Sequence, residues 1–181
     1  GQRRVFDVNN PPACVSFGDC GDGGGVEDAE FTLITGLEVS PDASRLAVMS
    51  AQCVREVGPD GIIRTILGTC VRAQDAPIVS AFEDDTDAVV GTQINDLFRT
   101  SSAYDREGSL HATDGSSVWR HDADGLWRRV LGRKIPEGDP GDPLQYQMPY
   151  QIHDITFGPE GQLHMMSESG FVIERLTPTG Q

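Results

Sequence analysis

Histidines and carboxylates are the residues of this chain whose types and spacing could do chemistry. His153 and Asp154 are adjacent at the start of an apolar segment, and an imidazole beside a carboxylate can act in acid–base catalysis or bind a metal. His111 and His164 follow a leucine in two similar stretches, LHATD and LHMMS, and His121 replaces an aliphatic residue of two related stretches. These equivalences predict that His111, His164 and His121 are packed, structural histidines. His153 with Asp154 is left as the candidate site.

Two acidic stretches could bind ligands. The Gly-rich segment 19–28 superficially suggests Ca²⁺, a cation that takes several oxygen ligands. Its spacing does not match the DxDxDG loop and lacks the distal Glu, which predicts a turn whose carboxylates cap backbone amides. The second stretch lies in a long insertion, where an acidic run is most often a solvated face. An exposed loop on a rigid scaffold is still a candidate binding loop, and its members are Glu83, Asp84, Asp85 and Asp87.

Sequence motifs for catalysis are absent. No GxSxG, HExxH or phosphate-loop pattern occurs, and the spacing of Ser, His and Asp indicates no triad. We therefore predict no cofactor and no metal. A non-catalytic role is favoured, and the question of enzymatic activity stays open.

The four cysteines predict disulfides rather than zinc, because they show no CxxC spacing and no paired histidines nearby. Cys14 and Cys20 bracket a Gly-rich loop that a disulfide would staple. Cys53 opens the third strand of the first copy, and Cys70 ends the fourth strand. If Val57 faces the residue just after the turn GPDG, Cys53 lies opposite Ile66, short of Cys70, so this pair needs a bend; two buried thiols are the alternative. The even count favours an oxidising, extracellular setting.

Composition and charge exclude some classes of partner. The chain has 181 residues, 38% hydrophobic and 23% charged, with a net charge of −14. This length is enough for one domain with a core. The negative charge argues against nucleic-acid binding and against adhesion to anionic membranes. No signal peptide and no apolar run of about 20 residues is found, so we expect a mature or excised segment without membrane insertion.

A sequence pattern of strands and turns occurs three times along the chain. Segments 36–68, 101–132 and 153–180 each run from an apolar strand through a Pro/Asp/Gly-type turn to a second and a third strand. The third strands lead to the loops GPDG, DADG and TPTG, and fourth strands follow as IIRTILG and LWRRVLG. Four antiparallel strands repeated in this way are typical of β-propeller blades. We expect an all-β propeller segment with copies at 33–70, 96–133 and 151–181, and His153 near the channel mouth.

The phase of the repeat predicts how the propeller closes. The third copy has no fourth strand, whereas residues 1–8 read as an orphan fourth strand. Known propellers have about four to eight blades, so three blades do not close a ring. Either two chains form a homodimer with a six-bladed ring, or the missing blades belong to a longer parent protein. In both cases the expected partner is a protein.

The loops between copies carry a family resemblance. The segment CGDGG at 20–24, followed by the strand around Leu37, resembles the GDGGxAxxAxL crossover of NHL-type propellers. The stretches PPACVSFGDCGDGG and DGIIRTILG are similar to the NHL propeller of teneurins and related bacterial YD/RHS-repeat proteins. Ala47, His111 and His164 depart from the family's Tyr.

The resemblance implies a non-catalytic propeller of a secreted or cell-surface adhesion or toxin protein. Such a module would serve in protein contact or scaffolding. The alternative is a metal-dependent propeller lyase or lactonase with its site at the channel mouth.

Overall fold

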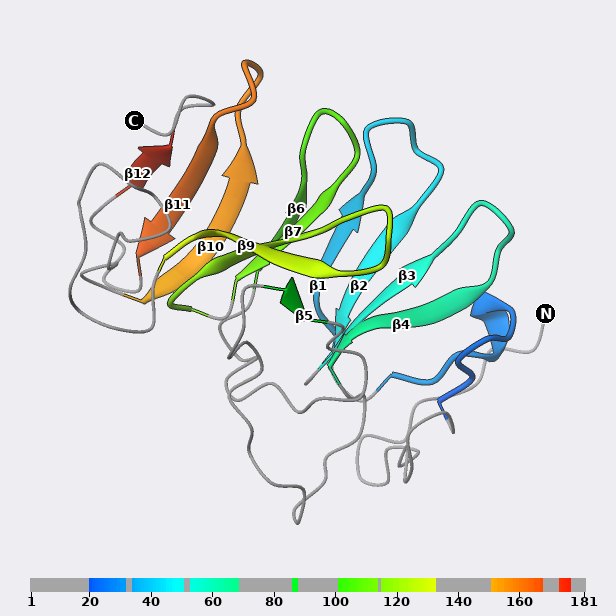
Figure 1. Cartoon of the computed structure of the whole chain (residues 1–181). Coiled ribbons are helices and arrows are strands. Elements are labelled where there is room, and N and C mark those ends of the chain that lie inside the picture. The colour runs from blue at the N-terminus through cyan, green and yellow to red at the C-terminus, as the bar shows by residue number, and fades with distance from the viewer. Residues whose placement is uncertain are drawn as a thin grey trace, which may run out of the picture.

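The computed structural model describes residues 20–31, 34–50, 53–68, 86–87, 101–113, 115–132, 151–167 and 173–176. These residues form three antiparallel sheets that stand side by side, together with one 3₁₀ turn, η1 (Val26–Asp28) (Figure 1). Residues 1–8 lie outside the described ranges, so the orphan strand expected there stays a prediction. No helix among the described residues is long and apolar enough to cross a membrane.

Each sheet is a blade, and its strands follow one another in sequence. Blade 1 consists of β1 (Ile34–Val39), β2 (Leu46–Ser50), β3 (Cys53–Val57) and β4 (Ile63–Gly68). Blade 2 consists of β6 (Ser102–Tyr104), β7 (Leu110–Thr113), β8 (Val118–His121) and β9 (Trp127–Leu131), with β5 (Thr86–Asp87) paired to the outer side of β9. Blade 3 consists of β10 (Ile152–Phe157), β11 (Leu163–Ser167) and β12 (Ile173–Leu176). The predicted all-β propeller architecture is confirmed.

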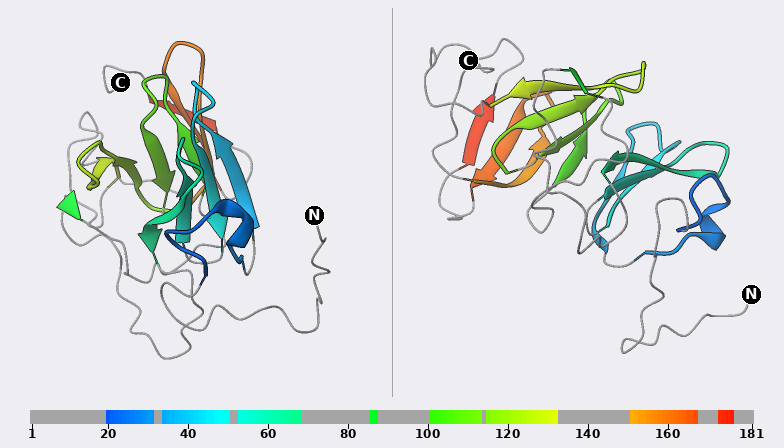
Figure 2. Two further views of the ribbon diagram at one scale, coloured as in Figure 1. Left: turned by 90° about the vertical axis from the view of Figure 1, so that its right-hand side faces the viewer. Right: turned by 60° about the horizontal axis from the view of Figure 1, so that its bottom comes forward.

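Two apolar layers hold the blades together. We call the face of a blade that points to the preceding blade its upstream face, and the opposite face its downstream face. The downstream face of blade 1 packs on the upstream face of blade 2 through Ala47, Met49, Val54, Leu67, Tyr104, Leu110, Ala112, Trp119 and Trp127. Blades 2 and 3 meet in the same way through Ala103, Val118, Leu131, Ile152, Ile155, Leu163 and Met165. Figure 2 shows the resulting stack of sheets from two further sides.

The register of blade 1 corrects the expected position of Cys53. Val57 pairs with Ile63, and a bulge falls between Val54 and Arg55, so Cys53 lies opposite Gly68. The regular ladder assumed from the sequence had placed Cys53 opposite Ile66. The hairpin register accounts for one residue of this shift, and the bulge, which adds one residue to one strand and bends it, accounts for the other. Cys53 therefore lies opposite a residue two positions before Cys70.

Gly132 is a glycine that the fold requires. Its φ is +89°, and a Cβ there would lie 2.5 Å from the carbonyl oxygen of Ser116. Gly125 has a similar φ of +82°, but a Cβ there would meet no atom within 4 Å. We expect Gly125→Ala to cost about 1 kcal/mol of unfolding free energy from the positive φ alone. Gly132→Ala should cost about 2 kcal/mol more because it also overpacks the turn. Urea denaturation of both variants measures the difference, and equal losses would contradict the close approach at Gly132.

Candidate functional site

The innermost strands of the three blades bring two carboxylates together. Strand β6 packs against both β1 and β10, at the edge that faces the central axis of a closed propeller. Ser101, just before β6, donates a hydrogen bond from its hydroxyl to the Asp154 carboxylate. The same carboxylate accepts the backbone N–H of Ile155 at 3.0 Å. The side chain of Asp154 is therefore held at the junction of blades 2 and 3.

Glu38 of β1 is the second carboxylate. Burial raises the pKa of Glu38, and the negative charge of Asp154 raises it further. Two residues from blades 1 and 3 thus interact electrostatically although more than a hundred residues separate them in sequence. A carboxyl group whose pKa is raised in this way holds its proton at a higher pH, as an acid–base group must.

The two members of the predicted channel site, His153 and Asp154, are neighbours on β10. Asp154 joins the Glu38 and Ser101 group just described, and both Asp154 and the neighbouring His153 are exposed to solvent. The register of β10 shifts between Ile152 and Asp154, so the regular alternation of the strand is interrupted at His153. Within the described residues no group of three or more His, Cys, Asp and Glu side chains could hold a metal ion.

Glu38 could have been noticed from the sequence. It interrupts the apolar stretch GLEV of β1, at a position that points to the following blade because its cross-strand partner Ala47 belongs to the core between blades 1 and 2. Ser101 gave no such signal, since a serine before a strand is common.

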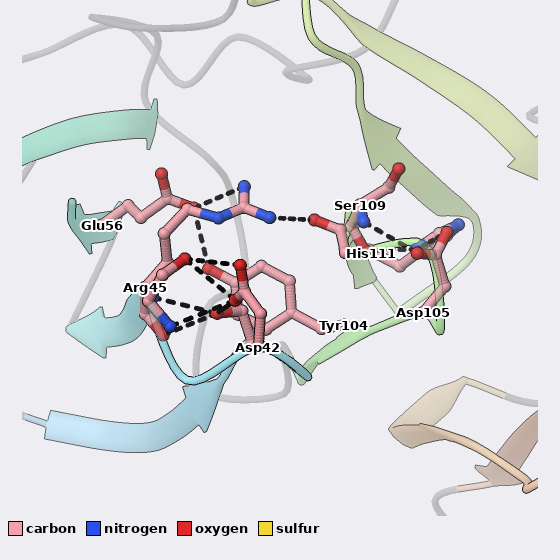
Figure 3. A network of polar contacts seen from close by, with 10 residues as sticks. Asp42, Arg45, Glu56, Tyr104, Asp105, Ser109 and His111 are labelled. Carbon is pink, nitrogen blue, oxygen red and sulfur yellow. Dashed lines mark hydrogen bonds and ion pairs between the residues drawn. The ribbon is translucent and has the colours of Figure 1, made fainter. Parts of the chain in front are cut away.

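A polar network joins blades 1 and 2 at the hairpin end of the strands (Figure 3). Arg45 extends from the first turn of blade 1, lies 3.5 Å from the Glu56 carboxylate, and donates to the backbone oxygen of Gly108 in the matching turn of blade 2. Tyr104 donates its hydroxyl proton to Glu56 at 2.7 Å. The Arg45 guanidinium also lies 5.2 Å from the centre of the Tyr104 ring. These contacts fix the relative position of the two blades.

The phenol of Tyr104 stays protonated in this network. Burial raises its pKa, and the neighbouring Glu56 carboxylate raises it further, both as a hydrogen-bond acceptor and as a negative charge. Tyr104 therefore acts as a hydrogen-bond donor to Glu56 and not as a base. The network joins blade 1 to blade 2, and its polar groups form hydrogen bonds and ion pairs with one another.

The sequence predicts packed, structural positions for His111, His121 and His164, and the structure confirms them for His111 and His121. His111 is 6% exposed and its ring lies edge-on to Phe157, with 4.7 Å between ring centres. His121 stacks on Trp127 at 5.0 Å. His164 is half-buried on the downstream face of blade 3.

We expect acid to destabilise the fold through His111. Burial lowers the pKa of His111 below its ordinary value of 6.5, although Asp105 opposes the shift. Below pH 6.5 the unfolded chain therefore takes up a proton before the folded one does. Stability is full above that pH and is lost as the pH falls toward the folded pKa. Urea denaturation on either side of pH 6.5 measures the slope. His111→Phe should reduce this slope without removing it, because burial lowers the pKa of His121 too. An unchanged slope would contradict the assignment to His111.

The Gly-rich acidic segment contacts blade 1 through the side chain of Asp22. The Asp22 carboxylate accepts the backbone N–H of Thr65 at 3.0 Å and its hydroxyl at 3.0 Å. It also lies 3.2 Å from the guanidinium of Arg55, whose side chain is fully buried. Capping of a backbone amide, predicted for this segment, is confirmed at Asp22. Arg55 itself was not predicted.

The cysteines and the acidic insertion are only partly within the described residues. Cys20 and Cys53 are 2% and 1% exposed and pack together, and neither is a free thiol. Cys14 and Cys70 lie outside the described residues, so both pairings stay predictions. Asp87 belongs to β5 and pairs with Trp127 through the backbone, whereas a loop had been expected. The rest of that candidate binding loop, Glu83, Asp84 and Asp85, also lies outside the described ranges.

Comparisons with known proteins place the chain among propellers. No protein-family model matches it, and no curated protein matches its sequence. Among solved structures it is similar to a gluconolactonase from Xanthomonas campestris, with 16% identity, a TM-score of 0.50, and coverage of 94% of this chain and 54% of that one. It is also similar to a protein of unknown function from Bacteroides thetaiotaomicron, with 14% identity, a TM-score of 0.50, and coverage of 78% and 46%.

These similarities establish the fold and nothing finer. The chain spans about half the length of the two structures it matches. Together with the stacked antiparallel sheets, they show a β-propeller segment. The resemblance to teneurins and YD/RHS-repeat proteins is not tested at this level and stays a prediction.

Proposed function

We propose that this chain is a non-catalytic propeller module whose outer blade faces make protein contacts. The observation that carries the proposal is the upstream face of blade 1. Leu37 and Val39 are each 58% exposed there, side by side on the strand β1. Exposed apolar side chains gathered on one surface are typical of protein interaction sites.

The setting we propose is extracellular, within an adhesion or toxin protein of the teneurin and YD/RHS type. The NHL-like crossover, the even number of cysteines and the strongly acidic composition support it. In such a protein the propeller would act as a scaffold between larger domains.

Association of the protein with itself tests the contact surface. We expect the average mass measured by sedimentation velocity to rise with protein concentration, because association removes the apolar side chains of Leu37 and Val39 from water. Added salt should strengthen association, since it screens the repulsion between chains of net charge −14. The double variant Leu37→Asp, Val39→Asp should reduce association, and Glu160→Lys in an exposed turn serves as the control. A wild-type protein that stays a monomer at every concentration and salt would overturn the proposal.

A second candidate function is a lactonase or lyase with its site at the channel. The specific observation is the pair Glu38 and Asp154, in which the pKa of Glu38 is raised. Nearby on β6, the Ser102 hydroxyl is buried and finds no hydrogen-bond partner among the described residues. The similarity to a gluconolactonase in fold makes a sugar lactone the substrate to try first.

Lactone hydrolysis with and without added Ca²⁺ or Zn²⁺ tests this candidate. Activity above the uncatalysed rate, lost in Glu38→Gln and in Asp154→Asn but kept in His153→Gln, would support it. An absence of hydrolysis at every pH and with either metal would leave only the contact function.

A further inference from the structure

The first strands of the three blades place equivalent residues on their upstream faces. Val39, Tyr104 and Phe157 each end the first strand and pair with the leucine that begins the second strand. Two residues earlier stand Leu37, Ser102 and Ile155, in the same register. The upstream face of blade 1 is thus built on the pattern that blades 2 and 3 use for packing.

Burial distinguishes blade 1 from the other two. Tyr104 is 8% exposed and Ile155 is 3% exposed, because each lies against the preceding blade. The equivalent Val39 and Leu37 are each 58% exposed. The outer part of the same face is already covered, since Arg55 of β3 is fully buried under the segment 20–31. What remains open is the inner part, where a preceding blade would pack.

The downstream face of blade 3 is open at the corresponding positions. Met166 is 36% exposed, whereas Met49 at the equivalent position of blade 1 is 6% exposed. His164 is half-buried, and its equivalent His111 is buried because its ring contacts Phe157 of the following blade. The contact between His111 and Phe157 shows what a residue at the position of His164 meets when another blade follows.

We propose that a second copy of this chain covers the upstream face of blade 1 with the downstream face of its own blade 3. The contact repeats the existing one between blades 2 and 3, so that Val39 lies against His164 of the partner subunit and Leu37 lies near the partner's Met166. This inference rests on the proposed contact function and names the partner for it.

Geometry favours a second copy as the occupant. One chain carries both open faces, so two chains cover all four with a single kind of contact, related by a two-fold axis. Two sets of three blades give a six-bladed ring, within the range of about four to eight blades found in propellers. The two solved structures it resembles are about twice as long as the aligned part of this chain, so a ring of two chains matches their size.

Cysteine cross-linking between two variants tests the register. Val39→Cys and His164→Cys are prepared separately, mixed and oxidised, so that only a contact between copies can join them. We expect a covalent dimer from the mixture and none from either variant alone. Glu160→Cys, on an exposed turn of blade 3, replaces His164→Cys as the control and should give no dimer with Val39→Cys. Circular dichroism checks that each variant folds, and Leu37→Cys with Met166→Cys is the second pair.

The outcomes separate this inference from the proposed function. A discrete particle of twice the chain mass, with cross-links in both pairs, supports the second copy. Association that Leu37→Asp, Val39→Asp weakens, but without cross-links in either pair, overturns the contact between blade 1 of one copy and blade 3 of the other and leaves the contact function standing. A monomer at every concentration overturns both.

Discussion

Replacing Trp127 by alanine is expected to destabilise the protein by about 4 kcal/mol, because a fully buried indole leaves a cavity that its neighbours fill only in part. Trp127 is 0% exposed and lies in the apolar layer between blades 1 and 2. Its ring N–H donates to the backbone oxygen of Ile66 in blade 1 at 2.8 Å. The variant therefore loses both apolar packing and a hydrogen bond between the blades.

Trp127→Phe separates the two contributions. It keeps most of the ring and loses the donor, so we expect a smaller loss of about 1–2 kcal/mol. Urea denaturation followed by circular dichroism measures both variants. Equal stability of Trp127→Ala and the wild type would show that blades 1 and 2 do not pack as described.

Loss of Arg55 should also have a large effect, about 3 kcal/mol, because removing one partner of a buried ion pair leaves the other uncompensated. The Arg55 guanidinium donates to the backbone oxygens of Cys20 and Glu30, each at 3.0 Å, as well as to Asp22. It also lies 5.1 Å from the centre of the Phe31 ring. We place the effect at the lower end of the range for buried pairs, because the Asp22 side chain keeps 25% of its exposure.

A double-mutant cycle assigns the loss to the pair. Arg55→Met and Asp22→Asn are measured singly and together by urea denaturation. We expect the double variant to lose clearly less than the sum of the single losses, because each single change already breaks the same contact. Strict additivity would show that Arg55 acts through the backbone oxygens alone. Arg64→Met, which breaks an exposed ion pair with Asp60, is the control and should cost less than about 1 kcal/mol.

Turn chemistry made the blades predictable from sequence. The loops GPDG and DADG give the same structure twice: in each, the Asp before the Gly accepts a backbone N–H two residues later and pairs with an Arg four residues later, at 2.8 Å. These local contacts depend on short spacings that a sequence displays directly. The strand order of each blade followed from them.

Contacts between blades were harder to predict, because they join residues far apart in sequence. The effect of Asp154 on the pKa of Glu38 depends on the angle between neighbouring sheets, and the position of Cys53 depends on a bulge that no turn residue announces. Arg55 would ordinarily be placed at the surface, since charged side chains are rarely fully buried unless paired. The sequence indicated a role for its partner Asp22 only as a cap of backbone amides.

Hydroxyl-radical footprinting of methionine and aliphatic side chains tests most directly whether the outer faces of blades 1 and 3 are the contact surface. Met166 is 36% exposed, and Met49 and Met165, at 6% and 4%, are internal controls on the inner layers. We expect Met166 to oxidise readily in dilute protein and to become protected as the concentration rises, in step with Leu37 and Val39, while Met49 and Met165 stay protected throughout. Oxidation of Met166 that is the same in dilute and in fully associated protein would contradict the account.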